Sequence, residues 1–197
     1  INLKASGSQG DRPGSSDSLT SARYDQLYGY VEKYLRPDHH ILDVGCAVGG
    51  FLKYLQARGF AELTGVDMAE NYVQQARVNT GVRIELGQAE KLPFADDSFD
   101  FLVLEQVMEH LINPGRAFRE AGRVLRPSGI LCVGVPDAAR YADCHFFDYY
   151  WVLLREHIQH FDINHLQQLA HGSGFELMEF HQTDHSVMSD KMIMPTL

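Results

Sequence analysis

A glycine-rich turn that follows an acidic strand end is the part of this sequence best suited to binding a ligand. The run Ile41–Val44 predicts a buried strand, and Gly45, Gly49 and Gly50 follow it before a helical pattern begins. Glycines lack a Cβ, so the chain can turn tightly and a ligand can approach the backbone over the helix N-terminus. The spacing is G-x-x-x-G-G rather than the G-x-G-x-x-G of dinucleotide sites, and Asp43 suits an ammonium group better than a pyrophosphate.

A second acid stands at the end of the next predicted strand. The sequence Leu-Thr-Gly-Val at 63–66 is typical of a strand and leads into Asp67, roughly 20 residues beyond the glycine turn. A carboxylate at that distance can accept hydrogen bonds from both hydroxyl groups of a ribose. The two acids together therefore predict a nucleoside-containing ligand with a positively charged group.

From about residue 24 to residue 180 the sequence resembles the class I S-adenosylmethionine-dependent methyltransferases. The first motif of that family is matched by Leu42, Asp43, Gly45 and Gly49, with Ala47 at the position of its middle glycine. The segment 87–94, Gly-Gln-Ala-Glu-Lys-Leu-Pro-Phe, is similar to a second family motif, in which Gln88 replaces an acid. The amide oxygen of glutamine can still accept a hydrogen bond.

The resemblance implies S-adenosyl-L-methionine as the cofactor and S-adenosyl-L-homocysteine as the product. By analogy with the family, Asp43 and the turn would hold the methionine end, Asp67 the ribose, and Gln88 with Ala89 the adenine, while Glu105 would lie beside the reacting methyl group. The cofactor-binding residues predicted in this way are Asp43, Gly45, Cys46, Ala47, Gly49, Asp67, Met68, Gln88, Ala89, Glu90 and Glu105.

Strand and helix patterns alternate along the chain, which predicts an α/β fold. Together with the resemblance, they predict a doubly wound, mostly parallel seven-stranded sheet, the Rossmann-like methyltransferase fold, with an antiparallel C-terminal strand. Residues 1–17 are rich in glycine and serine and read as a disordered arm, and residues 18–197 as a single domain. Strands are expected at 41–45, 62–66, 82–86, 99–104, 129–135 and 174–180, and helices at 18–35, 50–58, 69–79, 114–125 and 165–170.

The first of these helices carries tyrosines at helical spacing. Tyrosines in such a stripe more often pack in the hydrophobic core than line a binding site. In the resembling family, however, the N-terminal helix lies across the cofactor pocket, which makes Tyr24 a candidate ligand contact. At the other end, family members finish with an antiparallel pair, and the stop at Leu197 leaves open whether further residues follow.

The segment 136–161 is dense in aromatic and histidine residues and is predicted to form the acceptor site or its lid. Residues 156–161, Glu-His-Ile-Gln-His-Phe, resemble a signature of sugar C-methyltransferases and other small-molecule methyltransferases, in which the histidine lies by the acceptor. On that resemblance His157 is the candidate base, Glu156 its partner and His160 a further catalytic candidate. The alternative, that either histidine only hydrogen-bonds the loop, has similar weight.

The pair Glu109-His110 resembles part of a Glu-x-x-Glu-His segment that holds a divalent ion in quinone-precursor O-methyltransferases. Here Gln106 occupies the position of the first glutamate, and the loss of a charged oxygen weakens a hard-cation site. We therefore expect no essential metal.

The composition agrees with an enzyme-sized domain and limits the classes of molecule that the protein is expected to bind. The 197 residues are 45% hydrophobic and carry a formal net charge of −9, which argues against nucleic acid as a partner. Three widely spaced cysteines without a zinc pattern, no signal-like start and no long apolar run predict a cytoplasmic protein without a membrane segment.

The leading hypothesis is a small-molecule methyltransferase acting on an oxygen or carbon of a sugar, polyketide or phenolic metabolite. Two alternatives stay open. The departures at Ala47 and Gln88 would allow a non-catalytic relative that only binds the cofactor. A nucleotide-dependent oxidoreductase on a related sheet is disfavoured by the glycine spacing and by Asp43.

Overall fold

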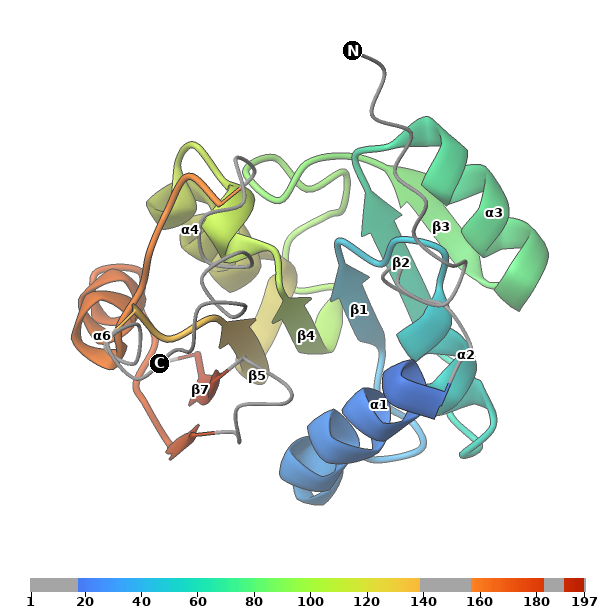
Figure 1. Ribbon diagram of the computed structural model, residues 1–197, viewed down its shortest axis with the longest axis horizontal. Helices are drawn as coiled ribbons and strands as arrows, with labels where there is room; N and C mark the ends of the chain where they lie inside the picture. Colours follow the sequence, from blue (N-terminus) through green and yellow to red (C-terminus); the bar gives the residue numbers. More distant parts are fainter. Residues whose placement is uncertain (1–17, 139–156, 183–189, 197) are drawn as a thin grey trace, which may run out of the picture.

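Seven strands form one sheet, in the order β3-β2-β1-β4-β5-β7-β6, in the computed structural model of the protein (Figure 1). The structure describes residues 18–138, 157–182 and 190–196. The strands are β1 (Ile41–Val44), β2 (Leu63–Asp67), β3 (Arg83–Leu86), β4 (Phe99–Glu105), β5 (Leu125–Val135), β6 (Glu179–His181) and β7 (Asp190–Pro195).

The strand directions confirm the predicted fold class. Strands β1 to β5 pair in parallel, whereas β7 pairs antiparallel with β5 and β6 antiparallel with β7. From β1 the chain builds outward through β2 and β3, and then returns to the other side of β1 for β4. Ligands of such sheets bind at this reversal of strand order, outside the carboxyl ends of the strands.

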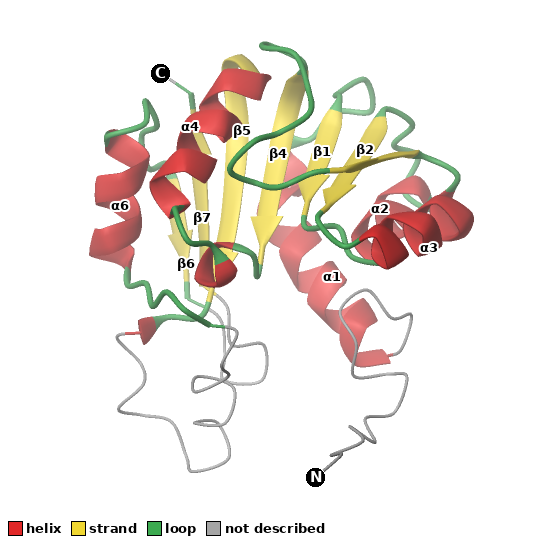
Figure 2. Cartoon of the chain, turned by 90° about the horizontal axis from the view of Figure 1, so that it is seen from above, coloured by secondary structure: helices red, strands yellow, loops and turns green. Residues whose placement is uncertain are grey.

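Helices cover both faces of the sheet (Figure 2). The helices α4 and α6 pack on one face, and α1, α2 and α3 pack on the other. Their bounds are α1 (Ser18–Val31), α2 (Gly50–Gln56), α3 (Glu70–Thr80), α4 (Pro114–Val124) and α6 (Ile163–His171), with short 3-10 turns η2 (Glu32–Tyr34) and η3 (Met108–His110). Across the described residues, no helix has the length and apolar character that a membrane span requires.

The alternation of side chains along β4 shows why the sheet has two cores. Leu102 and Leu104 belong to the apolar cluster under α4 and α6, whereas Phe101 and Val103 belong to the cluster under α1, α2 and α3. Successive side chains of a strand point to opposite faces, so a strand buried on both faces is apolar throughout. This central, doubly buried position fixes the end of β4, where Glu105 lies.

Two predicted strand boundaries were wrong. Strand β5 begins at Leu125 rather than at residue 129, because an irregularity with Ser128 at φ 65° precedes the regular pairing that starts at Ile130. The strand predicted at 174–180 is reduced to residues 179–181, because Gly174 has φ 83° and Phe175 makes only an isolated bridge to Thr196. The predicted arm at 1–17 and most of segment 136–161 lie outside the described residues.

Candidate active site

The turn between β1 and α2 repeatedly adopts left-handed backbone conformations. Gly45, Ala47 and Gly49 have φ values of 76°, 47° and 81°. A Cβ on Gly45 would overlap the side chain of Val107, and one on Gly49 would come within 2.7 Å of the Thr80 methyl group. The two matched glycines are therefore required by sterics, whereas the alanine at the middle position accepts a conformation that L-residues rarely adopt.

Asp67 connects this turn to the start of α3. One carboxylate oxygen accepts the backbone N–H of Ala47 at 2.9 Å, and the other accepts that of Ala69 at 2.8 Å. The residue is 8% exposed. Each carboxylate oxygen has a second lone pair, so Asp67 can hold both loops and still accept hydrogen bonds from a ligand.

Asp43 lies buried beside Asp67 at the carboxyl ends of the strands. It is 5% exposed, and burial, followed by the charges of Asp67 and Glu105, raises its pKa to about 7. A cationic group placed here would offset all three causes, because it would supply an opposite charge within the buried site. The site is therefore suited to a ligand that carries positive charge.

Arg23 is a site residue that the sequence analysis did not identify. Its guanidinium, on α1, donates to the Glu105 carboxylate at 3.0 Å and 3.3 Å. The Glu105 side chain is 11% exposed and that of Arg23 is 30% exposed. The contact brings α1 over the end of β4, and Tyr24 beside it packs on Phe51 of α2, which places this candidate ligand contact in a ring cluster next to the turn.

The remaining predicted cofactor residues lie around Asp67. Gly87 donates its backbone N–H to the Asp67 carbonyl, so the loop that follows β3 and carries Gln88, Ala89 and Glu90 starts next to the end of β2. Gln88 is exposed, Ala89 is buried and the Glu90 side chain accepts the N–H of Asn113. The other two residues differ in exposure: Met68 is 72% exposed, whereas the Cys46 thiol is buried, and burial raises its pKa well above the usual range.

His157 lies close to Glu109 and His110 rather than alone in its loop. The rings of His110 and His157 are 4.9 Å apart between centroids at an angle of 76°, and the donor atoms of all three residues lie within 4.8 Å of one another. The Glu109 carbonyl accepts the N–H groups of Ile158 and Gln159, at 2.9 Å and 3.0 Å. A metal ion could be held by this group of side chains. His160 is exposed in the same segment, and Glu156 lies outside the described residues.

Gln106, which stands where the quinone-precursor enzymes have a glutamate, has a strained backbone with φ 56°. Its N–H donates to the Gly134 carbonyl, and its buried side-chain nitrogen has no hydrogen-bond partner among the described residues. Strained backbone of this kind persists where the surrounding structure enforces it, as at ligand sites.

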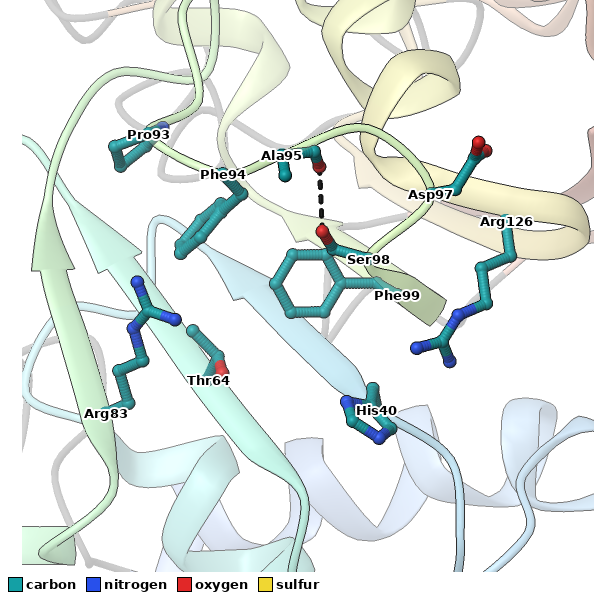
Figure 3. A pocket seen from close by; sticks show the side chains of 10 residues that line it. All are labelled: His40, Thr64, Arg83, Pro93, Phe94, Ala95, Asp97, Ser98, Phe99 and Arg126. Carbon is teal, nitrogen blue, oxygen red and sulfur yellow. Dashed lines mark hydrogen bonds between the residues drawn. The ribbon is translucent and has the colours of Figure 1, made fainter.

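A cavity of about 520 Å³ lies at the opposite edge of the sheet (Figure 3). Its lining residues come from the amino ends of the strands and from the β3–β4 connection, and include Thr64, Arg83, Phe94, Phe99 and Arg126. None of the predicted site residues lines it. Since ligands of parallel sheets bind at the carboxyl ends, we place the candidate site at the three carboxylates instead.

The chain is similar to known methyltransferases in sequence and in fold. A methyltransferase domain family matches residues 42–133, which include the glycine turn, Asp67 and η3. The chain is similar to the methyltransferase GfsG of Streptomyces halstedii, with 34% identity over 131 residues, covering 61% of this chain and 46% of the relative. It is also similar to a ubiquinone biosynthesis O-methyltransferase of Azorhizobium caulinodans, with 36% identity over 113 residues, covering 54% and 44%.

The fold has solved counterparts as well. A SAM-dependent methyltransferase from Methanosarcina mazei superposes with a TM-score of 0.73 at 21% identity, covering 87% of this chain and 98% of that one. At that identity the likeness concerns the fold alone. The chain spans less than half the length of either named sequence relative.

Proposed function

We propose that this chain, which carries a class I S-adenosylmethionine-dependent methyltransferase domain, methylates an oxygen or carbon of a small metabolite. The domain match, taken together with the methyltransferase relatives and the structural neighbours, confirms the predicted family, enzyme class and cofactor. The acceptor belongs to the sugar, polyketide or phenolic class in our proposal, and relatives named as O-methyltransferases support a small-molecule acceptor. We propose the cytoplasm as its location and expect no nucleic-acid partner, given the net charge of −9.

The main support for the proposal is that three carboxylates lie together where the strand order of the sheet reverses. Asp67 and Glu105 are the last residues of β2 and β4, and Asp43 is the next-to-last residue of β1, which lies between them. They fit the cofactor because its ammonium and sulfonium groups are cations and its ribose offers two hydroxyl donors. A nicotinamide dinucleotide would instead place its anionic pyrophosphate near Asp43, which the charges oppose.

Each residue has a role in this proposal. Asp43 and the turn through Gly45, Cys46, Ala47 and Gly49 would hold the methionine end, and Asp67 the ribose. The adenine would lie between Met68 and the loop with Gln88, Ala89 and Glu90. Glu105 would lie beside the methyl group, which the bound cofactor supplies on a sulfonium leaving group.

The protein's task in the reaction is positioning and proton removal. The site aligns the acceptor atom with the methyl group and excludes water, which converts a bimolecular step into an effectively unimolecular one. We propose that His157 takes the proton from the acceptor, with Glu156 and His160 in the same segment. We also propose that residues 18–197 form one domain, in which 136–161 bind the acceptor.

Calorimetric titration tests the cofactor site directly. Purified protein would be titrated with S-adenosylmethionine, with S-adenosylhomocysteine and, as a control, with NAD. Binding of the first two but not of NAD supports the proposal, and radiolabelled methyl transfer to a panel of phenols, polyketides and sugars then tests turnover. Binding without transfer to any acceptor would point to a non-catalytic relative, and no binding by the folded protein would contradict the proposal.

A further inference from the structure

Two imidazoles from distant parts of the chain face each other near the end of β4. His110 ends η3, and His157 lies near the end of the segment 136–161, yet their rings make an edge-to-face contact with centroids 4.9 Å apart. Backbone hydrogen bonds hold the two segments together, because the carbonyl of Glu109 accepts the N–H groups of both Ile158 and Gln159. The position of His157 is thus set by the segment that carries His110.

The surroundings of the pair combine exposure with apolar character. The His110 side chain is 38% exposed, whereas the neighbouring Glu109 side chain is only 2% exposed. Ile112 and Ile158, which lie close in sequence to the two histidines, are 85% and 51% exposed. Exposed apolar side chains therefore flank both histidines in the sequence.

We propose that His110 is a second catalytic residue and that the pair holds the acidic hydroxyl of a phenol or an enol. This inference rests on the proposed methyltransferase function and narrows its acceptor class. A neutral imidazole accepts a proton well only from a group that is not much less acidic than the imidazolium ion formed by the transfer. The pKa of a free imidazolium ion is near 6.5 and that of a phenol is near 10, so the equilibrium for proton transfer is unfavourable by a factor of about 10³ to 10⁴. For a hydroxyl as weakly acidic as water, the same equilibrium is unfavourable by a factor of about 10⁹.

Two imidazoles can promote ionisation of such a hydroxyl better than one can. One nitrogen of each ring lies within 4.8 Å of one nitrogen of the other, so two hydrogen bonds of about 2.8 Å can meet on one oxygen. His157 accepts the hydroxyl proton, while an N–H of His110 donates to the same oxygen and stabilises the negative charge that develops on it.

The step balances without any further reactant. The O–H bond breaks and its proton moves to a nitrogen of His157. An oxygen electron pair forms the bond to the methyl carbon, and the electron pair of the sulfur–methyl bond stays on sulfur, giving S-adenosylhomocysteine. The proton on His157 then leaves to solvent.

The same side chains could instead bind a metal ion, but their spacing favours the hydrogen-bonding pair. A carboxylate oxygen of Glu109 lies 4.0 Å from Nε2 of His110. Two ligands that share a tetrahedral zinc at about 2.0 Å lie about 3.3 Å apart. A metal centre would therefore require the side chains to move together.

The probe for this inference is 4-nitrophenol, whose ionised form is coloured. The experiment uses the full chain saturated with S-adenosylhomocysteine in EDTA, and records the absorbance of bound probe against pH. We expect the apparent pKa of the bound probe to fall by about one unit. Phenol should displace the probe, and cyclohexanol should not.

Three variants separate the chemistry from packing. His110→Phe keeps a ring against His157 but removes the nitrogen, and we expect it to weaken probe binding at pH 8 about tenfold and to abolish the pKa shift. His157→Phe should do the same. His171→Asn, at an exposed position on α6, is the matched control and should leave both quantities unchanged.

The outcomes separate this inference from the proposed function. If S-adenosylhomocysteine itself does not bind, the proposed function fails. If it binds but the probe does not, or binds only as the neutral phenol, or if His110→Phe behaves like the wild type, the inference is overturned. A probe that binds only after zinc is added back would also overturn it, and would identify Glu109, His110 and His157 as a metal centre.

Discussion

Arg23 of α1 and Glu105 of β4 form an ion pair over the carboxyl ends of the strands, with 3.0 Å between guanidinium nitrogen and carboxylate oxygen. The two residues are separated by 82 positions in the sequence. Because Glu105 also raises the pKa of Asp43, this contact links the first helix to the charge balance of the candidate cofactor site.

Removal of this ion pair should destabilise the protein measurably. Arg23→Ala leaves the Glu105 carboxylate, which is 11% exposed, without its guanidinium, and we expect a loss of about 1–2 kcal/mol in the free energy of unfolding. Arg36→Ala is the matched control, because Arg36 pairs with Asp38 where both side chains are about 70% exposed, and it should cost under about 0.5 kcal/mol. Urea unfolding of both variants would check this, and equal losses would contradict it.

Asp67 should be needed in its charged form. In Asp67→Asn one oxygen becomes an NH₂ group, which would meet the backbone N–H of Ala47 or of Ala69 donor to donor. We expect the Kd for S-adenosylhomocysteine to rise at least about tenfold, since hydrogen bonds to charged groups contribute about 1.5–3 kcal/mol.

The control for this variant is Asp97→Asn, at an exposed residue with φ 52°, a conformation that asparagine tolerates. Calorimetry with both variants gives the comparison. An unchanged Kd in Asp67→Asn would remove Asp67 from the proposed ribose site.

Two substitutions in the glycine turn, one from glycine to alanine and one from alanine to glycine, should differ in their effect on stability. Gly45→Ala should cost about 1–3 kcal/mol in the free energy of unfolding, because its φ is 76° and the new Cβ would overlap Val107. Ala47→Gly should change stability by under about 1 kcal/mol, because relief of the left-handed conformation opposes the greater flexibility of glycine in the unfolded chain. Thermal and urea unfolding would compare them, and similar effects of the two changes would contradict the steric account.

Much of this site was predictable from sequence because strand ends are encoded locally. Asp43 and Asp67 stand at the ends of strand-like segments, and parallel strands bring such residues to one edge of the sheet. Arg23 carries no local signal, since nothing near it in the sequence indicates its partner in β4. His110 was recognised only through its resemblance to a metal-binding segment, because its contact with His157 depends on tertiary packing of residues 157–159 against η3.

The sequence-based strand limits failed where backbone conformation rather than residue pattern ends a strand. Residues 174–180 alternate like a strand, but the turn at Gly174 delays regular pairing until Glu179. The Pro-Ser-Gly run at 127–129 reads as a turn, yet β5 extends across it with an irregularity. In both places tertiary pairing overrides a local preference.

The pKa of Asp43 predicts how stability varies with pH. The unfolded chain loses this proton near its ordinary value of 3.8, whereas the folded protein holds it to about pH 7. Stability contributed by the folded carboxyl is therefore fully present below pH 4 and is lost as the pH rises through 7, by roughly 4 kcal/mol in total. Asp43→Asn, which stays neutral, should remove this fall.

Urea unfolding of wild type and Asp43→Asn at pH 5 and pH 8 isolates that effect, because other titrating groups are common to both proteins. We expect the stability of the variant relative to wild type to be greater at pH 8 than at pH 5 by roughly 2–3 kcal/mol, because wild type has lost only part of this stability at pH 5. A constant difference between the two proteins at both pH values would show that burial does not hold the proton on Asp43.

Cofactor binding should expel the same proton. If the ammonium group of the ligand lies against Asp43, as we propose, it favours the ionised carboxylate and lowers the pKa from about 7. At pH 6 binding of S-adenosylhomocysteine should then release close to one proton, and affinity should rise with pH until about 7. Calorimetry at pH 6 in two buffers with different ionisation enthalpies measures the release, since the observed heat then depends on the buffer. Identical heats in both buffers would mean that Asp43 keeps its proton in the complex and that the ammonium group binds elsewhere.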